Sequence, residues 1–331
     1  AHALHEIIES RENVIIMGHS LTDVDSLGAG IGIFCAAKVL GKKAQIVIND
    51  PTSSIRPLME CFSVDKGYPE DMFITSEIAL EMVSRNTLVM VVDTNRPSYT
   101  ECPELLKKTD TIVVFDHHRQ NSEVIENPVL SYIEPYASSA CEMIAEVLQY
   151  FSENIKLEPS EADCIYAGIL IDTNNFMTKT GVRTFEAAAY LRRAGAEVTR
   201  VRKMLRNDMA AYKARAEAVR HAEVYRGAFA ISVCPADNIE SPTIVGAQAA
   251  NELLNIVGIK ASFVLTEYQG KIYISSRSID EINVQLIMER VGGGGHLNVA
   301  GAQLTNCTIQ EAKRMIQDTI DEMIKEGDIQ E

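Results

Sequence analysis

Short apolar runs alternate with longer amphipathic segments along the first two thirds of the chain. The runs are rich in Val and Ile, which indicates buried strands, and the longer segments have apolar residues at helical spacing. The runs span residues 14–19, 44–50, 87–94 and 111–118, and the predicted helices span about 26–40, 76–86, 139–151, 160–172 and 184–193. Because strands alternate with helices, we expect right-handed βαβ units and a mostly parallel sheet.

The pattern changes after about residue 225 into that of a smaller α+β domain. Its predicted strands lie at 227–234 and 300–304 and in a hairpin at 261–278, and its predicted helices lie at 241–258, 283–291 and 308–326. Residues 198–225 have Arg and Lys among regularly spaced apolar residues and are predicted to form one linker helix. The sequence thus predicts an α/β protein with domains at 1–197 and 226–331.

Two helix starts carry a recognisable capping pattern. Ser139 with Glu142 fits a capping box, and Ser160 with Asp163 fits another. Since the second helix then runs through an apolar segment, we expect Asp172 to lie at a helix end.

Several apolar runs end in residues that commonly bind metal ions. These residues are His19, Asp93, the neighbours Asp116, His117 and His118, and Asp172, while Asp23 and Asp25 follow His19 in a turn. The carboxyl ends of parallel strands share one edge of a sheet, where ligands of α/β proteins bind. We therefore expect these groups to meet at one site.

The chemistry of these groups favours hard divalent cations. Four carboxylates and two imidazoles, from His19, Asp23, Asp25, Asp93, His117 and Asp172, suit Mn²⁺, with Mg²⁺ as a substitute. Asp23 and Asp25 point to opposite sides of an extended turn, so each can reach a different ion, and Asp93 could bridge both. Two cations about 3.5–4 Å apart would clamp the attacking and leaving oxygens of an in-line phosphoryl displacement.

Composition narrows the class of partner. The 331-residue chain carries a formal charge of -15, which argues against long DNA as a partner. Its seven scattered cysteines fit reduced thiols in a cytoplasm. With no run long enough for a membrane span and no signal-peptide pattern, we expect a cytoplasmic protein without membrane contact of its own, or the soluble part of a membrane-anchored one. A homodimer is compatible with the sequence.

Two glycine-rich stretches have competing interpretations. Gly28, Gly30 and Gly32 mimic half of a dinucleotide fingerprint, but they lie inside a predicted helix, where close packing on a sheet explains them better. The loop 292–295 could be a flexible linker, or it could let a phosphate or base edge approach the backbone.

Neighbouring polar residues favour binding at the second stretch. Arg277 and His296 flank the loop with groups that can pair with phosphate, and Gly294 and Gly295 would supply the close approach. Arg119 and Ser139 are further substrate-binding candidates, although Arg119 could be a surface charge and Ser139 only a helix cap.

Together these motifs resemble a known family. The set His19-x-x-x-Asp23-x-Asp25, Val92-Asp93-Thr94, Asp116-His117-His118 and Asp172-Thr173 is similar to the four phosphoesterase motifs of the DHH family, and GGGGH-x-x-x-AGAQL resembles its associated C-terminal domain. The resemblance implies that His19, Asp23 and Asp93 hold one Mn²⁺, and that Asp25, Asp93, His117 and Asp172 hold the other. It also implies that His118 faces the phosphate and that Asp116 orients a histidine.

Within that family, the segments FDHHR, YIEPYASSACE and GILIDTNNF resemble the catalytic portion of GdpP-type cyclic di-AMP phosphodiesterases. The implied reaction is hydrolysis of cyclic di-AMP to linear 5'-pApA, with cyclic di-GMP left open. Alternatives are a nanoRNase or pAp phosphatase acting on short oligonucleotides, a pyrophosphatase of the same superfamily, and a non-catalytic module that binds cyclic dinucleotides. The membrane spans and sensor domains of the GdpP type are absent from this sequence.

Overall fold

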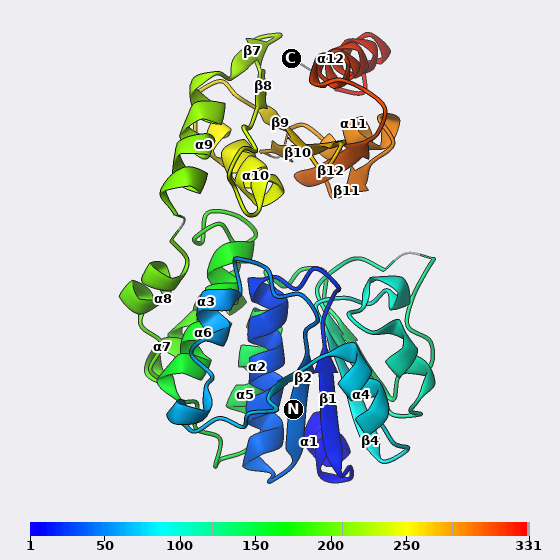
Figure 1. Cartoon of the computed structure of the whole chain (residues 1–331), viewed down its shortest axis with the longest axis vertical. Helices are drawn as coiled ribbons and strands as arrows, with labels where there is room; N and C mark the ends of the chain where they lie inside the picture. The colour runs from blue at the N-terminus through cyan, green and yellow to red at the C-terminus, as the bar shows by residue number, and fades with distance from the viewer. Residues whose placement is uncertain (121, 207, 280, 330–331) are drawn as a thin grey trace. The chain divides into compact units, whose positions relative to one another are not determined.

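The computed structural model describes residues 1–120, 122–206, 208–279 and 281–329, which form two compact units (Figure 1). The first unit comprises Ala1–Arg206 and the second comprises Asn207–Glu331. Within the described residues, no helix is both long and apolar enough to cross a bilayer.

The first unit contains a six-stranded sheet in which all neighbouring strands are parallel. Its strands are β1 (Asn13–Met17), β2 (Lys43–Val47), β3 (Phe73–Ile74), β4 (Thr87–Val92), β5 (Ile112–Asp116) and β6 (Leu130–Ile133). Their order is β3-β2-β1-β4-β5-β6. The predicted α/β class with a parallel sheet is confirmed, and β3 and β6 are two short strands that the apolar pattern did not indicate.

Helices cover both faces of this sheet (Figure 1). They are α1 (His2–Glu9), α2 (Val24–Val39), α3 (Arg56–Met59), α4 (Ser76–Met82), α5 (Ala140–Gln149), α6 (Pro159–Asp172), α7 (Val182–Arg193) and α8 (Val198–Met204), with 3₁₀ helices η1 (Val64–Lys66), η2 (Pro97–Tyr99) and η3 (Pro103–Lys107). Alternate residues of β1 enter different cores: Val14 and Ile16 join one cluster, and Ile15 and Met17 join the other. Burial on both faces explains why the strands read as continuous apolar runs.

The start of α6 differs from the prediction. Its capping box uses Glu158 and Glu161, and the Glu161 carboxylate accepts the backbone N–H of Glu158 at 2.8 Å. Ser160 therefore lies inside the helix and does not cap it. Pro159 occupies the first helical position, where its missing N–H costs nothing and its fixed φ suits the turn.

The stretch predicted as one linker helix contains two helices. α8 ends before Leu205, and α9 (Met209–Arg220) begins after Asp208, whose side chain accepts the backbone N–H of Ala211 at 2.8 Å. The N-cap at Asp208 starts a new helix. The apolar periodicity nevertheless continues across the break, which is why the sequence indicated a single helix. The domain limits at 197 and 226 stay a prediction.

The second unit contains a mixed β-sheet with helices on both faces. Its strands are β7 (Glu223–Tyr225), β8 (Phe229–Val233), β9 (Ala261–Tyr268), β10 (Lys271–Ser278), β11 (Gly294–Gly295) and β12 (Val299–Leu304), and its further helices are α10 (Pro242–Leu253), α11 (Val284–Arg290) and α12 (Ile309–Glu326). The strand order is β11-β12-β10-β9-β8-β7, and only β8 and β9 pair in parallel. The predicted hairpin β9–β10 turns at Gln269 and Gly270, both with positive φ. The α+β class is confirmed.

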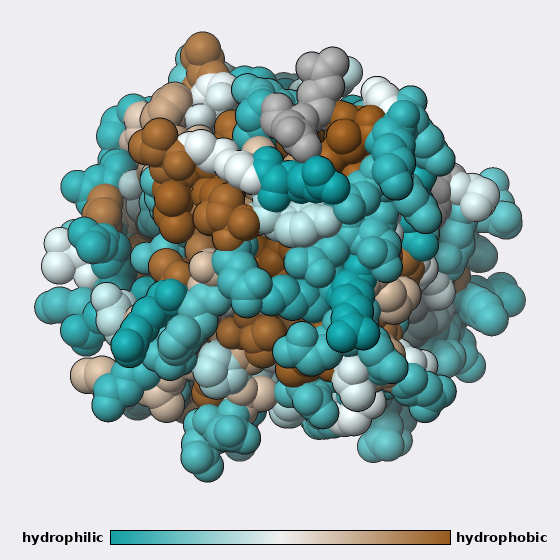
Figure 2. All heavy atoms as spheres, turned by 90° about the horizontal axis from the view of Figure 1, so that it is seen from above, coloured by the Kyte–Doolittle hydropathy of each residue, from teal (hydrophilic) through white to brown (hydrophobic). Residues whose placement is uncertain are grey.

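Buried apolar side chains form a separate core on each face of the second sheet. The face of the molecule shown in Figure 2 is mainly hydrophilic, with hydrophobic side chains gathered in small groups between the polar ones. Such a surface is ordinary for a globular protein.

Candidate metal centre

The predicted metal-binding residues lie where β1, β4 and β5 end. β1 pairs with β2 on one side and with β4 on the other, so the chain connections diverge between β1 and β4. Crevices of this kind, beyond the carboxyl ends of diverging strands, are where open parallel sheets bind ligands. His19 follows β1, Asp93 follows β4 directly, and His117 follows β5 directly.

The loop that carries His19 is held by the segment after η2. Ser20 donates its backbone N–H to the Tyr99 carbonyl at 2.8 Å, and Glu101 donates its N–H to the Gly18 carbonyl at 2.9 Å. Nε2 of His19 lies 3.6 Å from Oδ2 of Asp23 and 3.3 Å from Oδ2 of Asp93. Burial opposes a charge on His19, but these two carboxylates outweigh it and raise the pKa of His19 to about 11.

Asp93 lies between the two histidines that precede and follow it in the chain. Its Oδ2 faces His19, and its Oδ1 lies 3.3 Å from Nε2 of His117. Asp93 is buried and has a φ of 60°, a left-handed conformation that costs a non-glycine residue about 1–3 kcal/mol. Although burial alone would raise the pKa of Asp93, His117 and His19 lower it. The strained backbone thus directs one carboxylate toward both imidazoles.

Asp25 and Asp172 reach the same histidine from two helices. Asp25, in the first turn of α2, accepts the backbone N–H groups of Ala140 and Cys141 at the start of α5, at 2.7 and 2.9 Å. Asp172 is the last residue of α6, as predicted. Nε2 of His117 lies 3.8 Å from Oδ2 of Asp25 and 3.4 Å from Oδ2 of Asp172.

Burial and mutual repulsion shift the pKa values of this group. Burial, together with the Asp93 charge, raises the pKa of Asp25 to about 7. Burial and the Asp25 charge raise the pKa of Asp172 well above its usual range. Burial works against a charge on His117, but the Asp93 carboxylate raises its pKa to about 10. Carboxylates held this close repel one another unless a cation lies between them.

These groups fit a pair of hard cations. The ligand atoms of His19, Asp23 and Asp93 lie within 4.8 Å of one another, as do those of Asp25, His117 and Asp172. Oδ1 of Asp93 and Nε2 of His117 are buried without a hydrogen-bond partner among the described residues, which is the state expected of atoms that face a metal. Oxygen-rich sets with imidazole suit Mn²⁺ or Mg²⁺.

A polar network holds His118 beside this centre. Nδ1 of His118 lies 2.7 Å from Oδ1 of Asp116, which also accepts the backbone N–H of His118 at 3.1 Å. The Asn95 amide donates to the other oxygen of Asp116, and at 3.2 Å to the His118 carbonyl. Asp116 is fully buried, whereas His118 is 42% exposed. Sequence analysis missed Asn95, although it lies only two residues after Asp93.

Glu101 is a second residue that sequence analysis missed. Its carboxylate accepts the backbone N–H and the amide of Asn49 at 2.7 and 2.8 Å, and the Thr22 hydroxyl lies 3.4 Å from it. Glu101 therefore links the loop after β2 to the loop that carries His19 and Asp23. Its signal in the sequence was weak because a single Glu in a loop usually faces solvent.

Two predicted substrate residues lie in the first unit, with different surroundings. Ser139 is fully buried, and its hydroxyl caps α5 by accepting the Glu142 N–H at 3.0 Å. Arg119 is exposed in the loop after β5 and makes no hydrogen bond or ion pair within the described chain.

The other predicted substrate residues cluster at one end of the second unit's sheet. Arg277 pairs with Val299 across β10 and β12, and Gly295 pairs with Ala300 across β11 and β12. His296 donates its backbone N–H to the Val299 carbonyl at 2.7 Å. Three neighbouring strands therefore bring these residues together.

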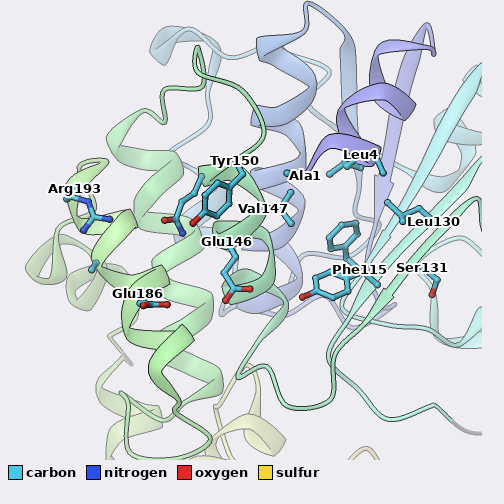
Figure 3. Close-up of a pocket in the computed structure, with 14 residues that line it drawn as sticks. Ala1, Leu4, Phe115, Leu130, Ser131, Glu146, Val147, Tyr150, Glu186 and Arg193 are labelled. Atoms are coloured by element: carbon cyan, nitrogen blue, oxygen red, sulfur yellow. The ribbon is translucent and has the colours of Figure 1, made fainter.

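One cavity of the first unit lies away from these residues. Its volume is about 730 Å³, and it is bordered by α1, β5, β6, α5 and α7. Figure 3 shows Phe115 and Leu130 of the sheet across from Glu146 of α5 and from Tyr150, which follows α5. Phe115 belongs to the same strand as Asp116, but its side chain enters the core on the α5 side. None of the predicted site residues lines this cavity.

Comparison with known proteins agrees with this geometry. The chain is 41% identical over 331 residues to the cyclic-di-AMP phosphodiesterase GdpP of Bacillus subtilis (strain 168), covering 99% of this chain and 50% of that protein. It is 27% identical over 325 residues to the bifunctional oligoribonuclease and PAP phosphatase NrnA of Mycoplasma genitalium, covering 96% of this chain and 95% of that protein. The chain spans about half the length of the curated relatives that it matches at the highest identities.

The fold and the domain content agree as well. The structure of an exopolyphosphatase-related protein from Bacteroides fragilis has a TM-score of 0.83 to this chain at 18% identity, covering 98% of this chain and 97% of that one, which shows a shared fold. Residues 13–169 match the N-terminal domain of the DHH family, and residues 228–326 match the DHHA1 domain. The chain therefore contains a DHH-family N-terminal domain followed by a DHHA1 domain.

Proposed function

We propose that this chain is a two-metal phosphodiesterase that hydrolyses cyclic di-AMP to linear 5'-pApA. The observation that carries the proposal is the pair of ligand sets that meet at one carboxylate, Asp93. The GdpP relative, a cyclic-di-AMP phosphodiesterase, supports the choice of substrate, because it aligns over 99% of this chain.

The contacts in the first unit support the proposed ligand sets. His19, Asp23 and Asp93 would hold one Mn²⁺, and Asp25, Asp93, His117 and Asp172 would hold the other. When bound, the two cations would supply the positive charge that stabilises an in-line displacement at phosphorus. Mg²⁺ is the substitute that the same oxygen-rich sets favour.

The chain's own residues hold this arrangement before any ligand binds. The N–H groups of Ala140 and Cys141 fix the Asp25 carboxylate, and the strained backbone of Asp93 fixes the shared one. Preorganised ligands of this kind avoid a reorganisation cost during the reaction. Asp116 engages Nδ1 of His118, so Nε2 is the atom that would face the phosphate.

Arg277 is the group that we propose for the far side of the substrate. Its guanidinium is half-buried, donates at 3.0 Å to the Asn251 amide oxygen and at 2.8 Å to the Ser276 carbonyl, and has no carboxylate partner in the described chain. Burial alone lowers its pKa to about 10. A guanidinium held in place without a counter-ion suits bidentate contact with a phosphate.

Gly294 and Gly295 in β11 differ in the reason for which each would be glycine. A Cβ on Gly295 would come within 2.4 Å of the Ala300 Cα, and the φ of Gly295 is 148°, so β12 itself requires glycine there. A Cβ on Gly294 would meet nothing within 4 Å. The open side of Gly294 is where a phosphate or base edge could approach the backbone.

A second candidate function is hydrolysis of short oligonucleotides or of pAp. It is favoured by the NrnA relative, because the match covers 95% of that protein and 96% of this chain. Its lower identity, 27% against 41%, leaves it as the alternative. A non-catalytic binding module is less favoured, because all six metal-type groups are present and converge.

The test is a substrate panel with product identification. Metal-depleted protein is loaded with Mn²⁺ and incubated with cyclic di-AMP, cyclic di-GMP, pApA and pAp, and the products are separated by chromatography. We expect the highest kcat/KM for cyclic di-AMP, with pApA as the product. A higher kcat/KM for pApA or pAp would favour the alternative, and tight binding of cyclic di-AMP without turnover would support the module.

A further inference from the structure

A cavity of about 710 Å³ lies in the first unit at the end of the sheet opposite the metal centre. Lys43 in its wall is the first residue of β2, so the cavity borders the amino ends of the strands. Its other walls come from the last turns of α2, the segment 66–71 and the start of α6. None of the metal-type residues lines it, so it is a separate site.

Lysine side chains dominate the charge of this cavity. Four of them line it, together with the two carboxylates of Asp71 and Glu158; the lysines are Lys38, Lys42, Lys43 and Lys66. In a chain with a formal charge of -15, this concentration of ammonium groups stands out. Local positive potential of this kind attracts small anions.

Two of the four ammonium groups have carboxylate partners. Nζ of Lys43 lies 2.6 Å from Oδ2 of Asp71, and Lys38 pairs with Glu161, a buried residue in the first turn of α6. Glu161 is also the acceptor of the Tyr68 hydroxyl, at 3.3 Å. These ion pairs fix the shape of the cavity.

The other two ammonium groups have no carboxylate partner in the described part of the chain. Lys66 donates only to the Glu60 carbonyl, at 2.7 Å, and Lys42 makes no hydrogen bond or ion pair there. A Lys ammonium offers three donors and a compact charge, which suits phosphate oxygens. Lys42 and Lys66 therefore line the cavity without a carboxylate that neutralises them in the described part of the chain.

We propose that this cavity binds a small phosphorylated anion. Its volume lies within the roughly 300–1,000 Å³ typical of small-molecule sites. α6 begins at Pro159 in the wall, but the capping box of Glu158 and Glu161 already engages N–H groups of its first turn, so the positive charge of the cavity comes from the lysines. Lys42 and Lys66 would contact the phosphate, and Lys38 and Lys43 would contribute charge from their ion pairs.

The position of the cavity connects it to the metal centre through two helices. α2 carries Asp25 in its first turn and Lys38 in its last, whereas α6 begins at the cavity and ends at Asp172. The helices pack closely, since a Cβ on Gly28 would come within 2.7 Å of the Cys164 carbonyl (Figure 1). A ligand in the cavity thus contacts both helices that supply carboxylates to the metal centre.

The test is direct binding to the whole chain in the presence of EDTA, which keeps phosphate probes from binding through divalent metal. Inorganic pyrophosphate and ADP are titrated by calorimetry at physiological ionic strength. We compare wild type with the double variant Lys42→Ala/Lys66→Ala, and with the control Lys107→Ala/Lys108→Ala, which removes the same charge from exposed positions outside the cavity.

We expect the Lys42→Ala/Lys66→Ala variant to weaken binding about 10-fold or more, because both unpaired ammonium groups are lost, and the control to change it less than about 2-fold. Tighter binding of ADP than of pyrophosphate would identify a nucleotide as the ligand type, and equal binding would identify phosphate alone. No binding by wild type at millimolar probe, or equal weakening in both variants, would overturn the proposal. Hydrolysis of cyclic di-AMP is measured separately, so its failure would count only against the proposed function.

Discussion

The two units hold candidate residues of opposite charge, and they differ in how function can be derived from them. The metal centre in the first unit gathers carboxylates and imidazoles from the ends of three strands and from two helices. The mutual repulsion of the carboxylates without a cation already indicates a ligand. The candidate surface in the second unit has one guanidinium on β10 and glycines on β11, and β12 lies between these two strands. A cluster of charged groups therefore indicates the kind of ligand that it binds. For glycines, only the three-dimensional structure distinguishes a packing function from a binding function.

The largest expected effect tests the first unit. Replacing Asp93 by Asn keeps the size of the side chain but removes the charge shared by both ligand sets. We expect kcat/KM for cyclic di-AMP to fall by roughly 1,000-fold or more, since electrostatic groups of this kind contribute about 100- to 1,000-fold each. Steady-state assays with saturating Mn²⁺ measure the change.

The matched control is Asp110→Asn, which removes one charge from an exposed position outside the centre. Its activity should equal that of wild type. If Asp93→Asn kept more than about a tenth of the activity, the shared-carboxylate arrangement would be refuted.

The next prediction concerns the pH dependence of metal binding in the first unit. His19 and His117 have pKa values raised to about 11 and about 10, and Asp25 has one raised to about 7, so the metal-free centre holds protons near neutral pH. Because metal binding requires the deprotonated forms, affinity should rise with pH, by about 10-fold per unit for each proton released. Mn²⁺ titrations between mildly acidic and mildly alkaline pH measure the slope; a flat profile would contradict the pKa directions.

A substitution at the candidate substrate surface of the second unit should change mainly KM. Arg277→Ala removes a fixed cation, so we expect KM for cyclic di-AMP to rise roughly 10- to 100-fold with kcat nearly unchanged, as for a lost charge-assisted contact. Arg314→Ala, on an exposed face of α12 in the same unit, serves as the control. A profile identical to wild type would assign Arg277 a purely structural function.

The smallest effects should separate the two glycines. Gly294→Ala fits the space around it and should leave unfolding unchanged while raising KM by about 3-fold or more, if a ligand approaches this backbone. Gly295→Ala should instead lower the free energy of unfolding by at least about 1–3 kcal/mol, because of its φ and its contact with Ala300. Thermal unfolding and kinetics of both variants measure the split. Equal behaviour of the two would show that the loop has a single function.

The sequence predicted the parts of the fold that repeat a strong pattern. Continuous apolar runs in β1, β4 and β5 reflect burial on both faces, and their polar ends fixed the edge where the site lies. β3 and β6 escaped prediction because β3 has two residues and β6 is only half-buried. The break between α8 and α9 was hidden because apolar spacing continues across Asp208.

Parts of the candidate site depend on distances that the sequence does not contain. The contact of Asn95 with Asp116 and the tie from Glu101 to Asn49 join residues from different loops. The left-handed backbone of Asp93 could not be predicted from residue type, because a non-glycine residue adopts this conformation only rarely.

The stoichiometry of Mn²⁺ binding tests the central claim most directly. Metal-depleted wild type and Asp93→Asn are titrated with Mn²⁺ by equilibrium dialysis at neutral pH. The account predicts two ions per wild-type chain and fewer than two for Asp93→Asn, because both ligand sets include that carboxylate. One ion or none in wild type, or two ions bound with unchanged affinity in Asp93→Asn, would contradict it.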